Sequence, residues 1–287
     1  MSVLRRLLSD LWRAPAKAPA GAAASAPIGA PPDPRELYPE LAAHARAPME
    51  LHQRILFGEV RVGNERFEDL FAQAVAATSL AVAPLKAIRR REACLNLIRY
   101  FRHARTLEGR WAECGVFTGT TSLALCLAAR AETPAFDGAG LHLVDSFEGL
   151  SELRAADYRR QRGADGRESA VPPPAHRTNF AAPIEMVREA MAAFPGAQLH
   201  QGWIPQVFAQ LPQERWSFVH VDVDLYEPTL ACLEYFFPRT MAGGAIVCDD
   251  YGSPAFPGAR RAWDEFCARA TLPYVALPTG QAVLIAS

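Results

Sequence analysis

Two apolar runs that each end on carboxylates limit most strongly what this chain can fold into. The first covers residues 216–224 and the second covers residues 243–250. Short runs rich in β-branched and aromatic residues are typical of buried parallel strands. In open α/β sheets the ligand crevice lies outside the carboxyl ends of the strands, so we expect Asp222, Asp249 and Asp250 to meet at one edge of a sheet.

These three acids also predict a metal site. Carboxylates that lie close together repel one another unless a cation lies between them, and a cluster of oxygen ligands suits Mg²⁺ or Mn²⁺ better than Zn²⁺. Asp224 follows in the same run and has two readings. It is either a contact of the site or the N-cap of the next helix, because Glu227 and Pro228 stand at positions typical of a first helical turn.

A glycine turn follows a short strand predicted at residues 110–114. Gly115 and Gly119 frame this turn, and an alanine- and leucine-rich helix follows it. Glycine allows the backbone to approach a ligand, and the helix N-terminus presents free N–H groups. No Gly-Lys-Ser/Thr motif is present, and Glu113 would repel a diphosphate. The acid therefore suits the ammonium of an amino-acid moiety, unless the turn is only a strand-to-helix connection.

The acid that ends the next predicted strand, residues 141–145, points to a nucleoside. Asp145 lies about one βα unit after the glycine turn, where such folds place the carboxylate that binds ribose hydroxyls, and Ser146 follows in the loop. Because a diphosphate loop is absent, a nucleoside without phosphate such as S-adenosylmethionine is favoured. Gly202 and Trp203 could frame an adenine, although Trp203 could equally be a core residue.

Composition and patterning divide the chain into three parts. Residues 1–34 are rich in Ala and Pro and are expected to form a flexible segment, and residues 35–105 have helical periodicity. Residues 106–287 are expected to form a Rossmann-like, mostly parallel α/β sheet that ends in an antiparallel hairpin. The polar, proline-containing segment 151–176 is predicted to be a mobile flap over the site.

The charge and cysteine content argue against several classes of partner. The formal net charge is -1, so nucleic acid and anionic membrane are not expected as main partners. Six cysteines without a C-x-x-C pair fit a reducing cytoplasm. Because no apolar run has the length of a membrane span, we expect no stable membrane insertion. A small-molecule acceptor is the expected partner, and a homo-oligomer is compatible with the sequence.

Taken together, these motifs resemble the macrocin O-methyltransferase family within the class I S-adenosylmethionine-dependent fold. The likeness extends over roughly residues 85 to 287 and rests on five blocks in the order and spacing of that family. The blocks are Glu113-Cys-Gly115-Val116, Asp145-Ser-Phe-Glu-Gly-Leu150, Gln201-Gly202-Trp203, Asp222-x-Asp224-Leu-Tyr226-Glu227, and Gly243-Gly244 to Asp249-Asp250-Tyr251. The resemblance implies methyl transfer from S-adenosylmethionine to a hydroxyl of a sugar in a small glycoside.

The resemblance also implies roles for individual residues. Mg²⁺ would be bound by Asp222, Asp249 and Asp250, and the cofactor would be held by Glu113, Gly115, Asp145, Ser146, Gly202 and Trp203. Asp222 is the candidate catalytic base, with His220 and His176 as alternatives. The chain departs from the family in two places: residues 117–121 read Phe-Thr-Gly-Thr-Thr instead of Trp-Arg-Gly-Gly, and His220-Val stands before Asp222 instead of Arg-Leu.

Two other functions fit parts of the pattern. A phosphatase of the haloacid-dehalogenase type would use Asp222 as nucleophile and Asp224 as acid, but the interval to Asp250 is too short for the elements that such enzymes insert there. A methyltransferase-like domain that binds its ligand without catalysis is the second alternative. Affinity for S-adenosylmethionine and metal-dependent turnover separate these alternatives from the main hypothesis.

Overall fold

The computed structural model describes the chain from residue 54 onward, with short gaps. The described ranges are 54–55, 58–78, 84–162, 167–175 and 177–287, and all of them belong to one compact unit, Pro48–Ser287. The segment 1–34, predicted to be flexible, therefore lies outside the described residues. So do the first part of the helical region predicted at residues 35–105 and His176.

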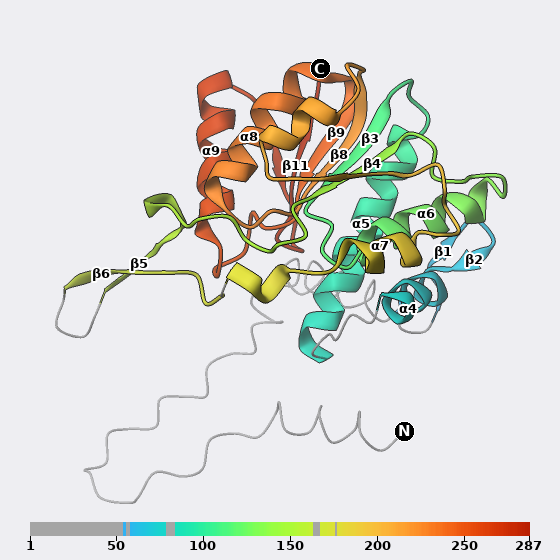
Figure 1. Cartoon of the computed structure of the whole chain (residues 1–287), viewed down its shortest axis with the longest axis horizontal. Helices are drawn as coiled ribbons and strands as arrows, with labels where there is room; N and C mark the ends of the chain where they lie inside the picture. The colour runs from blue at the N-terminus through green and yellow to red at the C-terminus, as the bar shows by residue number, and fades with distance from the viewer. Residues whose placement is uncertain (1–53, 56–57, 79–83, 163–166, 176) are drawn as a thin grey trace, which may run out of the picture. The chain divides into compact units, whose positions relative to one another are not determined.

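A seven-stranded sheet forms the centre of the fold, in the order β10-β11-β9-β8-β3-β4-β7 (Figure 1). The strands are β3 (Arg110–Cys114), β4 (Leu141–Asp145), β7 (Gln198–Gln201), β8 (Trp216–Val221), β9 (Thr240–Cys248), β10 (Val275–Ala276) and β11 (Ala282–Ile285). The five strands from β7 to β9 in this order are parallel, whereas β10 and β11 are antiparallel. The predicted mostly parallel sheet with a C-terminal antiparallel hairpin is confirmed.

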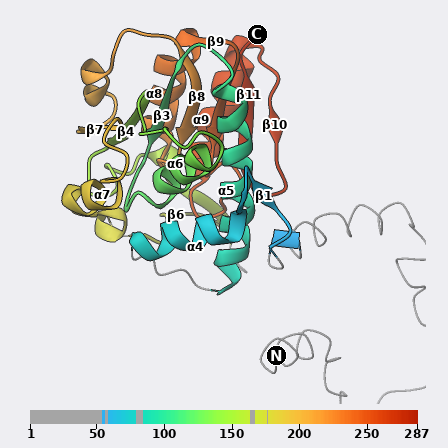
Figure 2. The same cartoon turned by 90° about the vertical axis from the view of Figure 1, so that its right-hand side faces the viewer.

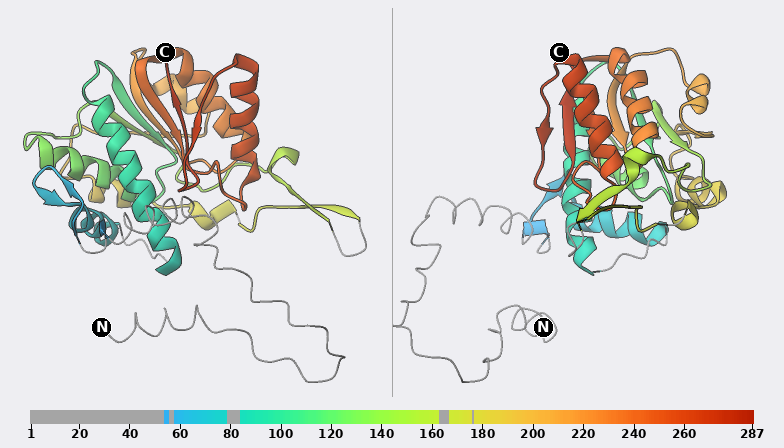
Figure 3. Two further views of the ribbon diagram at one scale, coloured as in Figure 1. Left: turned by 180° about the vertical axis from the view of Figure 1, so that it is seen from behind. Right: turned by 90° about the vertical axis from the view of Figure 1, so that its left-hand side faces the viewer.

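Helices cover both faces of the sheet (Figures 1 and 3). They are α4 (Phe67–Ala77), α5 (Pro84–Ala104), α6 (Thr120–Glu132), α7 (Ile184–Ala190), α8 (Tyr226–Phe236) and α9 (Pro257–Ala270). One buried apolar cluster joins α4, α5, α6 and α7 to one face, and a second joins α8 and α9 to the other. In Figure 2, α5 lies alongside the sheet. Three layers of this kind leave the carboxyl ends of the strands open for a site.

The side chains of β8 explain why this strand reads as continuously apolar. Phe218 packs into the cluster with α5 and α6, while Val219 and Val221 pack into the cluster with α8 and α9. Since successive side chains point to opposite faces, a strand that is covered on both sides needs apolar residues at every position. Ser217 and His220 are the exceptions, and the imidazole of His220, only 1% exposed, needs polar partners inside the protein.

The glycine pair of β9 has a different position from the expected one. Gly243 was predicted to start the strand, but β9 begins at Thr240 and its register with β8 shifts between Trp216 and Phe218. Gly243 has φ 79°, a left-handed conformation that glycine adopts at little cost. The pair therefore forms an irregularity within β9 rather than its beginning.

Two small hairpins were not predicted. The first, β1 (Arg61–Val62) with β2 (Glu65–Arg66), lies at the break that Gly58 and Gly63 mark in the helical pattern. The second, β5 (Arg159–Arg162) with β6 (Glu168–Val171), lies inside the predicted flap and projects from the body (Figures 1 and 3). Short 3-10 helices occupy Ala155–Asp157 (η1), Arg177–Phe180 (η2), Gln206–Gln210 (η3) and Phe237–Arg239 (η4). Within the described ranges, none of the helices has both the length and the apolar content to cross a membrane.

Candidate active site

A cavity of about 550 Å³ opens at the carboxyl ends of β3, β4, β8 and β9. Every residue predicted for the site lines it: Glu113, Gly115, Asp145, Ser146, Gly202, Trp203, Asp222, Asp249 and Asp250. Residues from five separate stretches of the chain thus come together because their strands are neighbours in the sheet. The volume lies within the range of pockets that bind small molecules, roughly 300–1,000 Å³.

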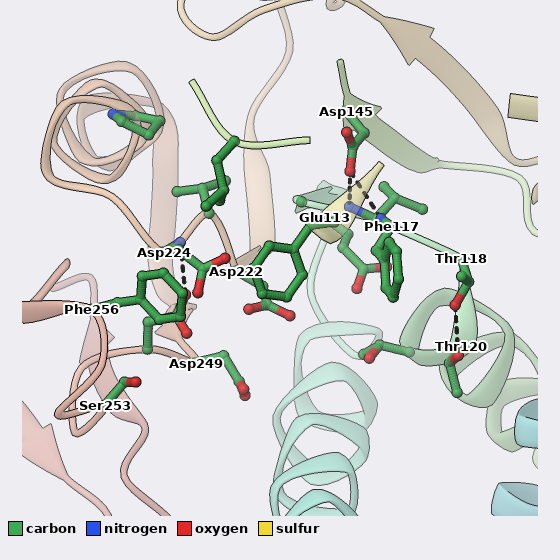
Figure 4. A pocket seen from close by; sticks show the side chains of 18 of the residues that line it. Glu113, Phe117, Thr118, Thr120, Asp145, Asp222, Asp224, Asp249, Ser253 and Phe256 are labelled. Carbon is green, nitrogen blue, oxygen red and sulfur yellow. Dashed lines mark hydrogen bonds between the residues drawn. The ribbon is translucent and has the colours of Figure 1, made fainter. Parts of the chain in front are cut away.

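The glycine turn is held by the carboxylate at the end of β4 (Figure 4). Asp145 Oδ2 accepts hydrogen bonds from the backbone N–H groups of Val116 (2.7 Å) and Phe117 (2.9 Å), and Oδ1 accepts one from Phe147 (2.7 Å). Asp145 therefore fixes the shape of the turn in addition to lining the cavity. Ser146 lines the cavity beside it, and its Oγ donates to the carbonyl of Gly149 at 3.2 Å.

Gly115 is required where the β3 turn meets the end of β8. It has φ 90°, and a Cβ at this position would lie 1.8 Å from the carbonyl oxygen of Asp222. The backbone N–H of Asp222 in turn donates to the carbonyl of Cys114 at 2.8 Å. Any larger residue at 115 would push the glycine turn away from the acids, so this glycine brings the two sides of the cavity into contact.

A buried chain of polar groups crosses three adjacent strands beneath the cavity. Glu113 Oε1 lies 3.0 Å from His220 Nδ1, and the hydroxyl of Ser122 donates to Glu113 Oε2. His220 Nε2 lies 3.8 Å from Asp249 Oδ1, too far for a hydrogen bond. Burial opposes the protonation of His220, but the carboxylates of Asp249 and Glu113 outweigh it and raise the pKa of His220 well above its usual value. A protonated imidazole cannot accept a proton, which makes His220 a poor base.

Four carboxylates face one another at the other side of the cavity, and they perturb one another. Burial, followed by the charges of Asp250 and Asp249, raises the pKa of Asp222 well above its usual value. Burial and the charge of Asp224 do the same for Asp250, and burial with the charge of Asp222 raises the pKa of Asp224 to about 8. In contrast, the pKa of Asp249 is lowered: burial opposes this shift, but the neighbouring His220 and the hydrogen bond from Gln281 outweigh it. A cation between these carboxylates would relieve such repulsion.

Asp224 is a residue of the cavity and not a helix cap. The N-cap of α8 is Leu225, so the cap reading of Asp224 is wrong. Asp224 has φ 59°, and its N–H donates to Asp250 Oδ2 at 2.8 Å. The tight turn after β8 thus directs both Asp222 and Asp224 to the cavity (Figure 4).

Sequence patterns alone did not reveal several residues that shape this site. Gln281 is fully buried, and its Nε2 donates to Asp249 Oδ1 at 2.8 Å. A row of three rings, Phe117, Phe180 and Phe256, lines the cavity with centroids 6.0 Å apart at each step. The only signal in the sequence was the polar Gln281 at the start of an apolar terminal strand. The phenylalanines look like ordinary core residues.

The acid cluster contains carboxylate oxygens that could coordinate a metal ion, but they are not arranged around one position. Its oxygens fit a hard divalent cation. In the described part of the chain, however, no group of three or more His, Cys, Asp or Glu side chains is arranged to hold a metal ion. Asp249 Oδ1 accepts from Gln281. A cation at this position would therefore need the carboxylates to reorient.

Known proteins with a similar sequence are methyltransferases. The family model described as macrocin-O-methyltransferase (TylF) matches residues 85–274. The chain is 28% identical over 153 residues to the 8-demethyl-8-(2,3-dimethoxy-alpha-L-rhamnosyl)-tetracenomycin-C 4'-O-methyltransferase of Streptomyces olivaceus, covering 52% of this chain and 55% of that protein. It is 27% identical over 169 residues to the demethyldecarbamoylnovobiocin O-methyltransferase of Streptomyces niveus, covering 57% and 60%. The chain thus spans little more than half the length of these curated relatives.

Solved structures share the fold at lower identity. The O-methyltransferase NovP is similar with a TM-score of 0.56 at 21% identity, over 70% of this chain and 80% of that one. CalS11, a calicheamicin methyltransferase, is similar with a TM-score of 0.57 at 21% identity, over 76% of this chain and 91% of that one.

Proposed function

The chain belongs to the macrocin O-methyltransferase family, and from that premise we propose that it transfers a methyl group from S-adenosylmethionine to a hydroxyl of a sugar in a small glycoside. One observation carries the proposal. A single cavity is lined on one side by a glycine turn with Asp145 and on the other by Asp222, Asp249 and Asp250. The first side suits a nucleoside and the second suits a polar acceptor.

The nucleoside side fits S-adenosylmethionine with one qualification about the ribose contact. An ionised carboxylate has about four lone-pair positions, and Asp145 already uses three on backbone N–H groups. One position is left, so we expect one strong hydrogen bond to ribose rather than two. Glu113 lines the same cavity, but both of its oxygens already have partners, so its contact with the methionine ammonium would be shared with His220 and Ser122.

The acceptor side supplies the proton acceptor. In methyl transfer the sugar oxygen forms a bond to the methyl carbon while the carbon–sulfur bond breaks, its electron pair stays on sulfur, and the hydroxyl proton leaves to a base. Asp222 is our candidate for this base. Its backbone lies against Gly115 of the glycine turn, and its carboxylate interacts electrostatically with that of Asp250. A positioned base typically contributes roughly 10²–10⁴ in rate.

We assign Mg²⁺ to Asp222, Asp249 and Asp250 as part of the same proposal. When bound, the ion would lower the pKa of the acceptor hydroxyl and hold the acceptor in place. The mutual repulsion of the carboxylates supports a cation there. For Asp249 to become a ligand, its oxygen would turn from Gln281, and the imidazole of His220, 3.8 Å away, would remain its neighbour behind the site.

The test is methyl transfer to defined glycosides. Purified protein is incubated with S-adenosylmethionine, Mg²⁺ and aryl rhamnosides, since one curated relative is named for a rhamnosyl acceptor. Mass spectrometry should find a single added methyl group on the sugar. Binding of S-adenosylmethionine without methylation of any sugar in a wide panel would favour a non-catalytic binding module. Release of phosphate from sugar phosphates instead would favour the phosphatase alternative.

A further inference from the structure

We propose that Asp157, which does not line the cavity, is a positioning residue that holds the acid-bearing turn after β8 in its working shape. The role in catalysis rests on the function proposed above, whereas the anchoring itself does not. Asp157 ends the short helix η1 at the root of the predicted flap, and it is only 1% exposed. A carboxylate this deeply buried needs partners, and one of its two partners comes from a distant part of the chain.

Each oxygen of Asp157 binds a different segment. Oδ1 accepts the backbone N–H of Tyr226 at 2.7 Å, and Oδ2 accepts the N–H of Arg154 at 2.8 Å. Tyr226 is the first residue of α8, and the N-cap Leu225 has no side chain that could bind the free N–H groups there. Asp157 therefore caps α8 from outside, at the end of the helix where a negative charge is favourable.

The turn that leads into α8 is strained and needs support from both sides. Asp224 adopts φ 59°, and the N–H of Leu225 contacts the carbonyl of Val223 at 2.5 Å. Such conformations persist only where surrounding contacts determine them. On one side Asp250 Oδ2 accepts the N–H of Asp224, and on the other Asp157 Oδ1 accepts the N–H of Tyr226. The two carboxylates bracket the turn that carries Asp222 and Asp224.

The first turn of α9 is shaped to receive this anchor. A Cβ at Gly258 would lie 2.0 Å from Asp157 Oδ1 and 2.8 Å from the backbone nitrogen of Tyr226, so only glycine leaves room for the contact. Arg261 Nη1 donates to the carbonyl of Ala156. Leu150, Leu225 and Phe256, which belong to the same three regions of the chain, form a small buried apolar cluster. The flap root, the turn after β8 and the loop after β9 therefore meet at Asp157.

Two substitutions at Tyr226 separate the effect of its backbone hydrogen bond to Asp157 from the effect of its side chain. Tyr226→Pro removes the N–H that Asp157 accepts, and proline is well tolerated at the first helical position. Leu225, with φ -103° and ψ 158°, already has the extended conformation that precedes proline. Tyr226→Ala is the matched control, because both variants lose the contact of the Tyr226 hydroxyl with Glu265 but only the alanine keeps the N–H.

Hydrogen exchange with S-adenosylhomocysteine bound tests the anchoring directly. In Asp157→Ala the amides of residues 222–226 should exchange at least about tenfold faster, which corresponds to about 1.4 kcal/mol. The glycine turn, residues 115–121, should be unaffected. Asp157→Asn should give a smaller effect, because its remaining oxygen can still accept one N–H. Unchanged exchange at residues 222–226 in Asp157→Ala, or faster exchange throughout β8 and β9, would overturn a local positioning role.

Kinetics with an acceptor from the glycoside panel tests the consequence. Asp157→Ala and Tyr226→Pro should each lower kcat/KM for the acceptor by about tenfold or more, whereas Tyr226→Ala should not. The double variant Asp157→Ala with Tyr226→Pro should lose no more than either single variant, because both remove the same hydrogen bond. The affinity for S-adenosylhomocysteine should stay within about twofold in every variant. Equal losses in Tyr226→Pro and Tyr226→Ala would overturn the proposal. Failure to methylate any acceptor refutes the proposed function, while the exchange experiment still decides whether Asp157 is the anchor.

Discussion

At the scale of single residues, Asp145 shows how one carboxylate can serve the fold and the ligand together. Two of its three backbone hydrogen bonds hold the glycine turn, the third is to Phe147, and the residue lines the cavity. Asp145→Ala should weaken binding of S-adenosylhomocysteine by about tenfold to a hundredfold, since a hydrogen bond to a charged group contributes roughly 1.5–3 kcal/mol. Calorimetry measures this, with Asp137→Ala as a control acid at an exposed turn. Unchanged affinity in Asp145→Ala would remove Asp145 from the cofactor site.

At the scale of elements, the flap divides into a fixed root and an exposed hairpin. Both strands of the β5–β6 hairpin are exposed along almost their whole length, and an isolated pair of strands is only marginally stable in water. We predict rapid amide exchange in Arg159–Arg162 and Glu168–Val171 without ligand, and slower exchange when cofactor and acceptor are both bound. The root, Ala155–Asp157, should be protected in both states. Equal protection of the hairpin with and without ligands would show a fixed insertion.

The contact between β4 and β7 should make stability depend on pH. His142 Nδ1 lies 3.0 Å from His200 Nε2, and Trp216, Arg110 and Glu214 are the further neighbours. Burial, then the charges of His200 and Arg110, lowers the pKa of His142 to about 4, and burial lowers that of His200. Both residues therefore bind fewer protons in the folded state than in the unfolded state.

This pair predicts that the free energy of unfolding is greatest above a pH of about 6.5, the ordinary histidine pKa, and falls as the pH decreases through that value toward about 4. Urea unfolding at a series of pH values measures the effect. The double variant His142→Gln and His200→Gln should show a shallower decrease over the same interval. An identical slope in that variant would mean that other groups control the acid sensitivity.

The sequence predicted elements well where the signal was local, and less well where it was not. The bounds expected for β3 and β4 agree with the structure, because glycines mark them locally: Gly115 follows β3 and Gly140 precedes β4. Asp224 was ambiguous because its role depends on Asp250, which lies 26 positions away. Asp157 left no signal, and Gln281 left only its polar character, since the partners Tyr226 and Asp249 lie 69 and 32 positions away. Contacts of this kind follow from the packing of elements, which local periodicity does not specify.

At the scale of the whole described unit, the strand order explains why these residues form one site. β3, β8 and β9 are adjacent, so Glu113, His220 and Asp249 lie in a row beneath the cavity. Glycine at position 115 lets the nucleoside side and the acid side touch. A sheet with this order and two covered faces offers only its edge of strand ends to a ligand. A cytoplasmic location and a homo-oligomer remain predictions from the sequence.

Methyl transfer as a function of Mg²⁺ concentration, in the wild type, Asp249→Asn and Asp222→Asn, tests most directly whether the acid cluster is the catalytic centre. The wild type should lose activity in excess chelator and regain it with Mg²⁺. Asp249→Asn should need more Mg²⁺ while binding S-adenosylhomocysteine normally, because Mg²⁺ requires near-ideal oxygen ligands. Asp222→Asn should be inactive at every Mg²⁺ concentration, because it lacks the base. Full activity of the wild type in excess chelator would contradict the metal site, and wild-type activity in Asp222→Asn would contradict its role as the base.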